Sequence, residues 1–296
     1  ALRDEGGRGD SGRGVSRADD DDFVFLELEL LRQLLSGTMR PNVGADALGF
    51  EWEEERAVDD FVFMCMLVGN DFIPGLPHLS VEDGALNKML RTYTDLLPSL
   101  GGYLTDKDQL HFERFERFVR ALSRNEQAHF EMKAGNVARR AGDNQPKLNH
   151  KRKYYLEKLG MHPRDTEGLR RLVTSYLEGL CWCLHYYHKG CRSWSWYYPD
   201  FYAPLASDLT DLDGYTVELE MGTPFPPIAQ LLAVLPPQSS QLVPEPMREL
   251  MLSPTSPVID AYPLDFVLDA NGKRNEWEAI ALLPFIDEAR LLGAVE

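Results

Sequence analysis

The residues best placed to do chemistry form a short turn, Gly69-Asn70-Asp71, directly after an apolar segment. Mg²⁺ prefers oxygen ligands and tolerates little misplacement. A carboxylate on a turn that a packed element holds therefore suits a site for such a cation, and Asn70 is close enough to help orient the ligands. The alternative is that Asp71 only caps the next turn, and a single aspartate leaves both interpretations open.

A second group of candidate residues is a dense aromatic run over residues 186–202. Aromatic side chains stack on nucleobases without reading the base sequence, and each stacked base contributes roughly 1–3 kcal/mol. Trp194 and Trp196 are the candidates for stacking, and Lys189 and Arg192 beside them could contact phosphates. The pattern does not decide which tryptophan stacks. For the rest of the run, core packing is the favoured alternative.

A buried helix predicted over residues 57–68 would position the turn that carries Asp71. This segment contains no Gly or Pro, and its apolar residues recur at helical spacing. Gly69 is a natural stop because it supplies the left-handed residue at a helix end. Another long helix is predicted over residues 166–189, directly before most of the aromatic run.

The other elements are predicted from the same periodicities. Residues 23–35 begin like a strand and change to helical spacing, a βα step typical of a parallel sheet. Short strands are predicted at Tyr103-Leu104 and over 265–269, with a tight turn at 269–272. Further helices are predicted over 82–97, 111–132, 228–235, 247–252, 275–283 and 285–292.

Composition and charge exclude several classes of protein. The chain has 296 residues, 44% of them hydrophobic, which is enough for one domain or two packed lobes. Four cysteines without zinc-ligand spacing favour reduced thiols in a cytosolic or nuclear compartment. The sequence predicts no membrane span, which would need about 18 apolar residues in a row. A net charge of −16 argues against a general nucleic-acid coat, but it constrains an enzyme less, because a cation and a local basic channel can carry the electrostatics.

Three blocks follow one another in a fixed order along the chain. They are Asp59–Phe63 with Val68–Pro74, then Ser175–Trp182 with His185–Tyr187, Ser193–Pro199 and Tyr202–Pro204, then Ile259–Asp260 with Tyr262–Pro263, Asp269–Lys273 and Leu282–Glu288. Together they resemble the Xrn/Rat family of processive 5′→3′ exoribonucleases, and most closely its nuclear Rat-type branch. The resemblance covers roughly residues 23–130 and 150–294.

The resemblance implies hydrolysis of 5′-monophosphorylated, single-stranded RNA to mononucleotides with Mg²⁺ or Mn²⁺. Asp71 matches a ligand in the family's acidic metal cluster, and one tryptophan of Ser193–Trp196 matches its base stacker. The fold implied is α/β, part of a PIN/flap-nuclease-like mixed sheet with flanking helices, followed by a mainly helical and irregular bracing region. A nuclear location goes with the Rat-type branch, and the cytoplasm is the alternative.

Several parts of the family's site are not recognisable in this sequence. Two-metal hydrolysis needs several carboxylates around cations about 4 Å apart. In the family most of these acids, the 5′-phosphate pocket and a stacking His lie ahead of the position of Phe23. We therefore expect an N-terminal catalytic segment, from the same gene product or another chain, as the partner of this chain, which would be inactive alone.

Two other functions stay open at this stage. One is a catalytically inactive relative that serves as a structural or RNA-scaffolding subunit. The other is a protein-interaction module that uses the Pro-rich segment 223–263. Asp200-Phe201 departs from the family pattern, which has an aromatic residue and a His there, and the added carboxylate is expected to weaken RNA affinity.

The expected domain organisation has four parts. Residues 1–22, rich in Gly, Arg and Asp, are expected to be disordered. Residues 23–132 would form the C-terminal part of the first conserved region, and 154–296 the second, which braces it and lines an RNA channel. Residues 133–153 hold seven Lys or Arg and one Asp, as a linker that either contacts RNA phosphates or stays mobile.

Overall fold

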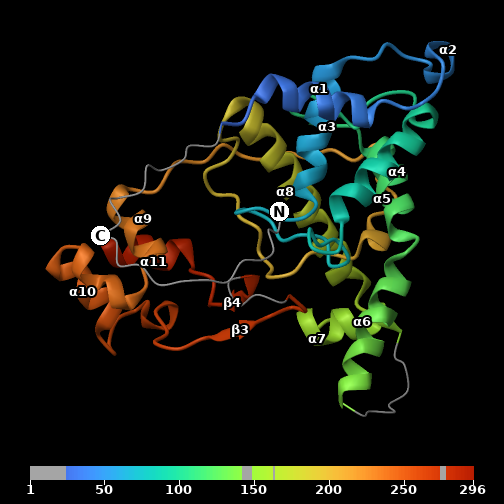
Figure 1. The fold of residues 1–296 in the computed structure, drawn as a ribbon. Helices are drawn as coiled ribbons and strands as arrows, with labels where there is room; N and C mark the ends of the chain where they lie inside the picture. The colour runs from blue at the N-terminus through green and yellow to red at the C-terminus, as the bar shows by residue number, and fades with distance from the viewer. Residues whose placement is uncertain (1–24, 142–148, 163, 274–277) are drawn as a thin grey trace, which may run out of the picture.

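A computed structural model of the chain describes residues 25–141, 149–162, 164–273 and 278–296, and these residues are mostly helical (Figure 1). Their β-structure consists of two two-stranded antiparallel ladders and one isolated bridge. Strand β1 (Thr105–Asp106) pairs with β2 (Gln109–Leu110), and β3 (Val267–Asp269) pairs with β4 (Ile280–Leu282). None of the helices in these ranges is long and apolar enough to cross a membrane.

The α-helices account for most of the described chain. They are α1 (Leu28–Met39), α2 (Ala45–Leu48), α3 (Glu54–Met66), α4 (Ala85–Leu100), α5 (Phe112–Ser123), α6 (Glu126–Ala141), α7 (His150–Leu159), α8 (Thr166–Lys189), α9 (Pro227–Val234), α10 (Glu245–Leu252) and α11 (Glu288–Val295). Short 3₁₀ helices lie at η1 (Ala206–Asp208), η2 (Pro237–Leu242) and η3 (Ile259–Ala261).

Two hydrophobic cores organise these helices. The larger core joins α3, α4, α5 and α8, and Phe63, Tyr93, Phe115 and Tyr176 are among its largest fully buried side chains. A smaller core lies among α9, α10, η3 and α11. Figure 1 shows α9, α10 and α11 gathered at one end of the molecule, with the β3–β4 ladder between them and the larger helical body.

Asp60 ties α3 to its neighbours. The side chain is fully buried, and its two oxygens accept hydrogen bonds from the Tyr93 hydroxyl, the Leu104 amide, and the amide and hydroxyl of Thr105, all at 2.7–2.8 Å. A buried carboxylate needs this many partners to be tolerated. Helix α3, which leads into the Asp71 turn, is thereby fixed to α4 and β1.

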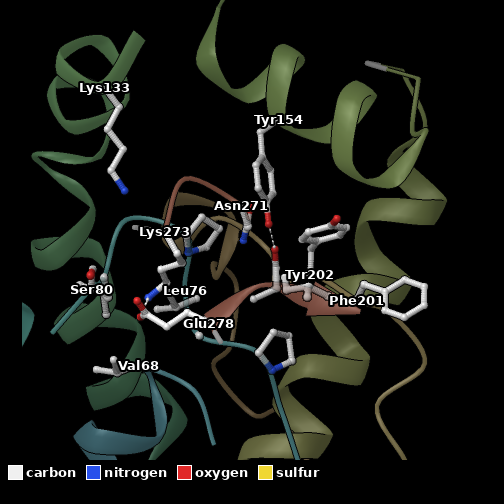
Figure 2. Close-up of a pocket in the computed structure, with 16 residues that line it drawn as sticks. Val68, Leu76, Ser80, Lys133, Tyr154, Phe201, Tyr202, Asn271, Lys273 and Glu278 are labelled. Carbon is white, nitrogen blue, oxygen red and sulfur yellow. Dashed lines mark hydrogen bonds and ion pairs between the residues drawn. The ribbon is translucent and has the colours of Figure 1, made fainter. Parts of the chain in front are cut away.

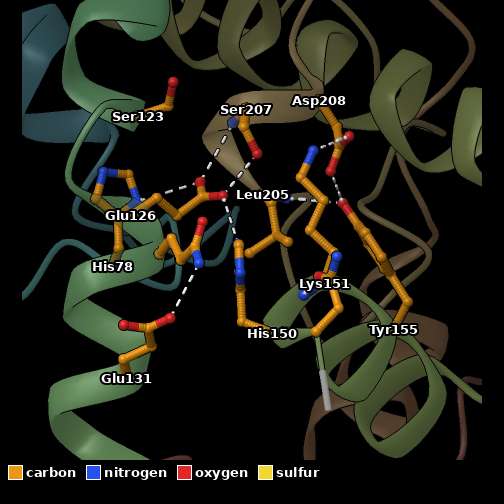
Figure 3. A network of polar contacts seen from close by, with 12 residues as sticks. His78, Ser123, Glu126, Glu131, His150, Lys151, Tyr155, Leu205, Ser207 and Asp208 are labelled. Atoms are coloured by element: carbon orange, nitrogen blue, oxygen red, sulfur yellow. Dashed lines mark hydrogen bonds and ion pairs between the residues drawn. The ribbon is translucent and has the colours of Figure 1, made fainter. Parts of the chain in front are cut away.

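A second buried carboxylate, Glu126, joins the start of α6 to η1 and α7 (Figure 3). It accepts hydrogen bonds from the Ser207 hydroxyl and amide, and one of its oxygens lies 3.4 Å from Nε2 of His150. Nδ1 of His78 lies 3.9 Å away, too far for a hydrogen bond. Burial, with help from the charges of Lys88 and His129, lowers the pKa of His78 to about 3, so its imidazole is neutral.

Several sequence predictions are confirmed. Helix α3 covers most of the predicted 57–68 helix, and α8 has the predicted bounds 166–189. Gly69 has a φ of 103°, and the turn at 269–272 places Asn271 and Gly272 at positive φ. The predicted helices 82–97, 228–235, 247–252 and 285–292 correspond to α4, α9, α10 and α11 with shifted ends.

The predicted fold class is wrong in its sheet. The described residues contain no extended mixed sheet, so the α/β, PIN/flap-nuclease-like expectation is replaced by a mostly helical fold. Residues 25–27, predicted as the end of a strand, are irregular and lead into α1, while 23 and 24 lie outside the described residues. Phe25 and Leu26 are exposed, and neither belongs to a ladder within the described ranges.

Three local predictions also need correction. The single helix predicted over 111–132 is two helices, α5 and α6, separated at Arg124-Asn125. The helix predicted over 275–283 is wrong in its described part, where residues 280–282 form β4. The strand predicted at Tyr103-Leu104 begins two residues later, as β1.

The expected boundaries of the basic linker do not coincide with breaks in the helices. Helix α6 runs to Ala141 and α7 begins at His150, so only residues 142–148 of the segment lie outside the described residues. The expected disordered segment, 1–22, lies outside them too.

Candidate functional site

The turn that carries Asp71 is closed at its base by backbone hydrogen bonds. The Leu76 amide donates to the Leu67 carbonyl at 2.9 Å, and the Asn70 amide donates to the Ile73 carbonyl at 3.1 Å. A Cβ at Gly69 would lie 2.7 Å from the Gly75 nitrogen, so a larger residue there would open the turn. Asp71 is therefore held on a tight turn, and its side chain is exposed.

Asn70 shapes this turn. Its Oδ1 accepts hydrogen bonds from the amides of Phe72 and Ile73, at 2.9 and 3.0 Å. Its Nδ2 lies 3.5 Å from Sγ of Cys183 on α8. Oδ1 is thus occupied by two amides and shapes the backbone beside Asp71. The role of Asn70 in orienting metal ligands stays a prediction.

Phe72 anchors the turn to an aromatic cluster on and after α8. Its ring centre lies 4.8 Å from that of Trp182 and 5.3 Å from that of Tyr186. Trp182 in turn stacks on Tyr186, at 5.1 Å and 12°, and on Trp196, at 5.5 Å and 24°. Each such pair contributes about 0.5–1.5 kcal/mol beyond the area it buries. Asp71 is thus one residue away from a fixed aromatic cluster.

Tyr187 was not among the predicted site residues, but it lies near Asp71. Burial raises the pKa of Tyr187, and the charges of Cys183 and Asp71 add to this effect. About half of the Tyr187 side chain is exposed. The sequence placed Tyr187 directly after Tyr186 on the predicted helix, which was the available indication of a role. Its nearness to Asp71 could not be predicted, because only the tertiary fold brings the Asp71 turn to this end of α8.

The structure distinguishes the two candidate tryptophans. Trp194 is 52% exposed, and its backbone amide donates to the Met221 carbonyl at 2.8 Å. Trp196 is half-buried, and its ring lies so close to α8 that a Cβ at Gly179 would be 3.0 Å from it. Trp182 also donates from Nε1 to the Ser193 carbonyl at 3.0 Å. The same residue that packs on Phe72 therefore holds the start of the run that displays Trp194.

The two predicted phosphate-contacting cations already have partners in the protein. Nζ of Lys189 lies 2.8 Å from Oδ1 of Asp108, whose Oδ2 lies 2.9 Å from Nδ1 of His185. Burial disfavours the charged form of Asp108, but the hydrogen bonds from Lys189 and His185 outweigh it and hold the pKa of that carboxyl well below its usual range. Arg192 donates from Nη2 to the Val217 carbonyl at 3.1 Å.

Asp200, the departure from the family pattern, is half-buried. Burial raises the pKa of Asp200, and the charge of Arg171 opposes that rise. The weaker RNA affinity expected from this carboxylate stays a prediction.

The described residues do not by themselves fit a two-metal centre. No group of three or more His, Cys, Asp or Glu side chains in those ranges is arranged to hold a metal ion. Asp71 is an exposed carboxylate that belongs to no such group among the described residues. We therefore derive no chemical step through a metal from this chain.

Comparison with known proteins decides the family. A family profile described as the Xrn1 helical domain matches residues 51–152 and 146–296. The chain is 36% identical to 5′-3′ exoribonuclease 1 of Homo sapiens, over 93% of this chain and 20% of the relative. The chain belongs to the Xrn family of 5′-3′ exoribonucleases.

Other Xrn relatives give similar values. The identity is 35% to a 5′-3′ exoribonuclease 2 homolog of Drosophila melanogaster, over 92% of this chain and 37% of the relative. The identity is 31% to 5′-3′ exoribonuclease 2 of Gallus gallus, over 99% of this chain and 40% of the relative. The chain thus spans between a fifth and two fifths of these Xrn proteins. Relatives of both kinds match, so the family is established and the branch within it is not resolved.

Proposed function

We propose that this chain is the helical, RNA-handling part of a 5′→3′ exoribonuclease that hydrolyses 5′-monophosphorylated, single-stranded RNA to mononucleotides. One observation carries the proposal. The turn that displays Asp71 is packed through Phe72 onto Trp182, and Trp182 fixes the run that displays Trp194. A candidate metal-binding carboxylate and a candidate base-stacking surface are thereby held on one packed unit, as positioning of a substrate requires.

In this proposal Asp71 supplies one carboxylate ligand of Mg²⁺ or Mn²⁺. The remaining ligands come from an N-terminal catalytic segment, either of the same gene product or of another chain. Trp194 stacks on an RNA base. Lys189 contacts a backbone phosphate with the ammonium hydrogens that Asp108 does not use, because an ammonium has three donors, and Arg192 lies beside it with part of its guanidinium committed to Val217.

The test is degradation of a 5′-monophosphorylated, 3′-labelled RNA in Mg²⁺ by this chain and by its full-length parent. We expect the parent to degrade the RNA processively, this chain alone to be inert, and Asp71→Ala in the parent to lower the rate at least about 100-fold, since a misplaced metal costs several kcal/mol of transition-state stabilisation. Asp213→Ala, which removes an exposed carboxylate from a loop, is the matched control and should leave the rate unchanged.

A second function is favoured by one observation. The described residues hold no group of acids fit for a metal, which a catalytically inactive relative would not need. Such a relative could still bind RNA on the aromatic surface as a scaffold. A full-length parent that binds single-stranded RNA but leaves it intact in Mg²⁺ and in Mn²⁺ would contradict the nuclease and establish the scaffold.

We also infer membership of the nuclear Rat-type branch, with a cytoplasmic location as the alternative. The support is the resemblance of the three ordered blocks to that branch. Fluorescence microscopy of the tagged full-length parent tests it. Accumulation in the nucleus is the expected result, and exclusion from the nucleus would contradict it.

A further inference from the structure

A pocket of about 190 Å³ lies at the base of the Asp71 turn (Figure 2). Its walls come from segments far apart in the sequence: residues 68–80, helix α6, the segment 201–203 and the β3–β4 hairpin. Gly75 forms part of the wall, and a Cβ there would lie 2.1 Å from the Val68 carbonyl oxygen. Only glycine therefore fits at this position, and the backbone of the turn borders the pocket.

Two lysines from different elements converge on this pocket. Lys133 extends from α6 toward the hairpin, and its Nζ lies 3.9 Å from the position that a Cβ would take at Gly272. Lys273 follows directly in the hairpin and lines the same wall. Two positively charged side chains therefore line one pocket.

The ion pairs of these two lysines leave ammonium donors available to a ligand. Nζ of Lys133 lies 3.7 Å from Oδ2 of Asp83, and Nζ of Lys273 lies 3.5 Å from Oε1 of Glu278. Both are long ion pairs, and neither ammonium makes a hydrogen bond with another described residue. Since each ammonium has three N–H donors, the pair presents up to six donors to a ligand, while Asp83 and Glu278 moderate the net charge.

Neutral polar groups complete the lining. The Ser80 side chain is only 7% exposed, and its hydroxyl has no hydrogen-bond partner within the part of the chain that the structure describes. The Asn271 side-chain amide lines the pocket and is likewise without a partner among those residues. The Tyr154 hydroxyl, in contrast, donates to the Ala203 carbonyl at 2.7 Å and is not available as a donor.

We propose that this pocket binds a phosphate group, either as free phosphate or as the phosphate of a nucleoside monophosphate. Phosphate oxygens are strong acceptors, and the lining offers charged donors from Lys133 and Lys273 and neutral donors from Ser80 and Asn271. A bound phosphate would accept hydrogen bonds from the two ammonium groups, whose ion pairs with Asp83 and Glu278 are long. Because the ligand touches Gly75, its occupancy is felt at the base of the Asp71 turn.

Isothermal titration calorimetry of this chain with sodium phosphate, AMP and adenosine, at constant ionic strength, tests the proposal. Phosphate and AMP should bind and adenosine should not. Lys133→Gln and Lys273→Gln should each weaken binding by at least about tenfold, as expected for the loss of a charged hydrogen bond. Lys153→Gln, an exposed lysine on α7, is the matched control and should bind as the wild type does.

The outcomes are distinct. Tighter binding of AMP than of phosphate identifies a nucleotide as the ligand, whereas equal binding identifies the phosphate group alone. No binding of either, adenosine binding as tight as AMP, or unchanged affinity in both lysine variants would overturn the proposal. If a lysine variant does not fold, Ser80→Ala provides the test, because it removes only one hydroxyl from the pocket. It should weaken the binding of phosphate and AMP a few-fold. Asp71→Ala should bind normally, so failure here is separate from failure of the proposed nuclease.

Discussion

At the scale of single residues, three neighbours in the turn have separate tasks. Asn70 shapes the backbone with its side-chain oxygen, Asp71 is presented to solvent, and Phe72 packs on Trp182. Rigid support from packed neighbours is what a functional carboxylate needs. Asp71 could be predicted from sequence because the helix, the glycine and the acid are consecutive.

The partners of these residues could not be predicted. Phe72 and Trp182 are separated by 110 positions, and local periodicity carries no information about contacts at that distance. The same is true of Asp108, which is far in sequence from Lys189 and pairs with it at 2.8 Å. A lysine that looks free for phosphate contacts in the sequence is thus partly neutralised in the fold.

The first residue-scale prediction separates Trp194 from Trp196. Trp194→Ala in the full-length parent should lower the affinity for single-stranded RNA about 5- to 100-fold, because a stacked base contributes roughly 1–3 kcal/mol. It should leave stability nearly unchanged, because the side chain is exposed. Trp196→Ala should instead lower the free energy of unfolding by roughly 3 kcal/mol, because it vacates the space against Gly179 and Trp182. Fluorescence anisotropy with labelled RNA and urea unfolding measure the two effects.

Tyr197→Ala serves as the control in both measurements, because it is an exposed aromatic residue of the same run. If Trp194→Ala binds RNA as the wild type does while Trp196→Ala loses binding without losing stability, the assignment of the stacking tryptophan is reversed.

At the scale of elements, helices with a continuous apolar stripe were predictable, and α8 is the clearest case. The break between α5 and α6 was not, since Arg124-Asn125 contains neither Gly nor Pro. It occurs where Glu126 is buried against Ser207 and His150, and those tertiary contacts set the direction of α6. The helix predicted over 275–283 was wrong at residues 280–282 for the same reason, because β4 forms by pairing with strand β3.

A prediction at this scale concerns the junction of α3, α4 and β1. Burial raises the pKa of Asp60 to about 6, against the opposing effect of its hydrogen bonds. The folded protein therefore holds a proton that the unfolded chain has released between pH 4 and 6. The free energy of unfolding therefore falls as pH rises through this window, and the contribution of Asp60 no longer changes above it. The change is on the order of 3 kcal/mol, at 1.36 kcal/mol for each pKa unit.

Urea unfolding from pH 4 to 7 measures this contribution against Asp60→Asn, which cannot titrate. The variant should be less stable at every pH, because an amide nitrogen would face two of the four donors. The stability gap should narrow by up to about 3 kcal/mol as pH rises. Asp95→Asn, on the exposed side of α4, is the control and should follow the wild type. A gap that stays constant with pH would show that Asp60 is already ionised at pH 4.

At the scale of the whole molecule, charge and composition excluded classes of function but did not locate a site. The net charge of −16 coexists with a pocket where Lys133 and Lys273 converge. The expectation of a mixed sheet came from the family resemblance and from the strand-like start of residues 23–35. A sheet depends on pairing between distant strands, whereas helices depend on local hydrogen bonds, so the helical part was the part that this sequence could specify.

The β3–β4 hairpin lies between the two cores of the molecule (Figure 1), and Asp269 anchors it. Its Oδ2 lies 2.5 Å from Nζ of Lys158 on α7 and also accepts from the Tyr202 hydroxyl. Burial raises the pKa of Asp269, but the hydrogen bonds from Lys158 and Tyr202 outweigh that effect and lower it overall. The charged form is thus the one that holds the hairpin against Lys158 of α7 and Tyr202.

Asp269→Ala should therefore loosen one end of the molecule without unfolding the other. The loss of charged hydrogen bonds costs roughly 1.5–3 kcal/mol, which falls on the smaller core. Limited proteolysis should cleave between residues 204 and 267 several-fold faster, and thermal unfolding should separate into two transitions. Asp265→Ala removes an exposed carboxylate from the segment just before β3 and should do neither. Equal cleavage rates and one shared transition in both variants would mean that the cores are coupled through contacts other than Asp269, since neither core would then depend on this carboxylate.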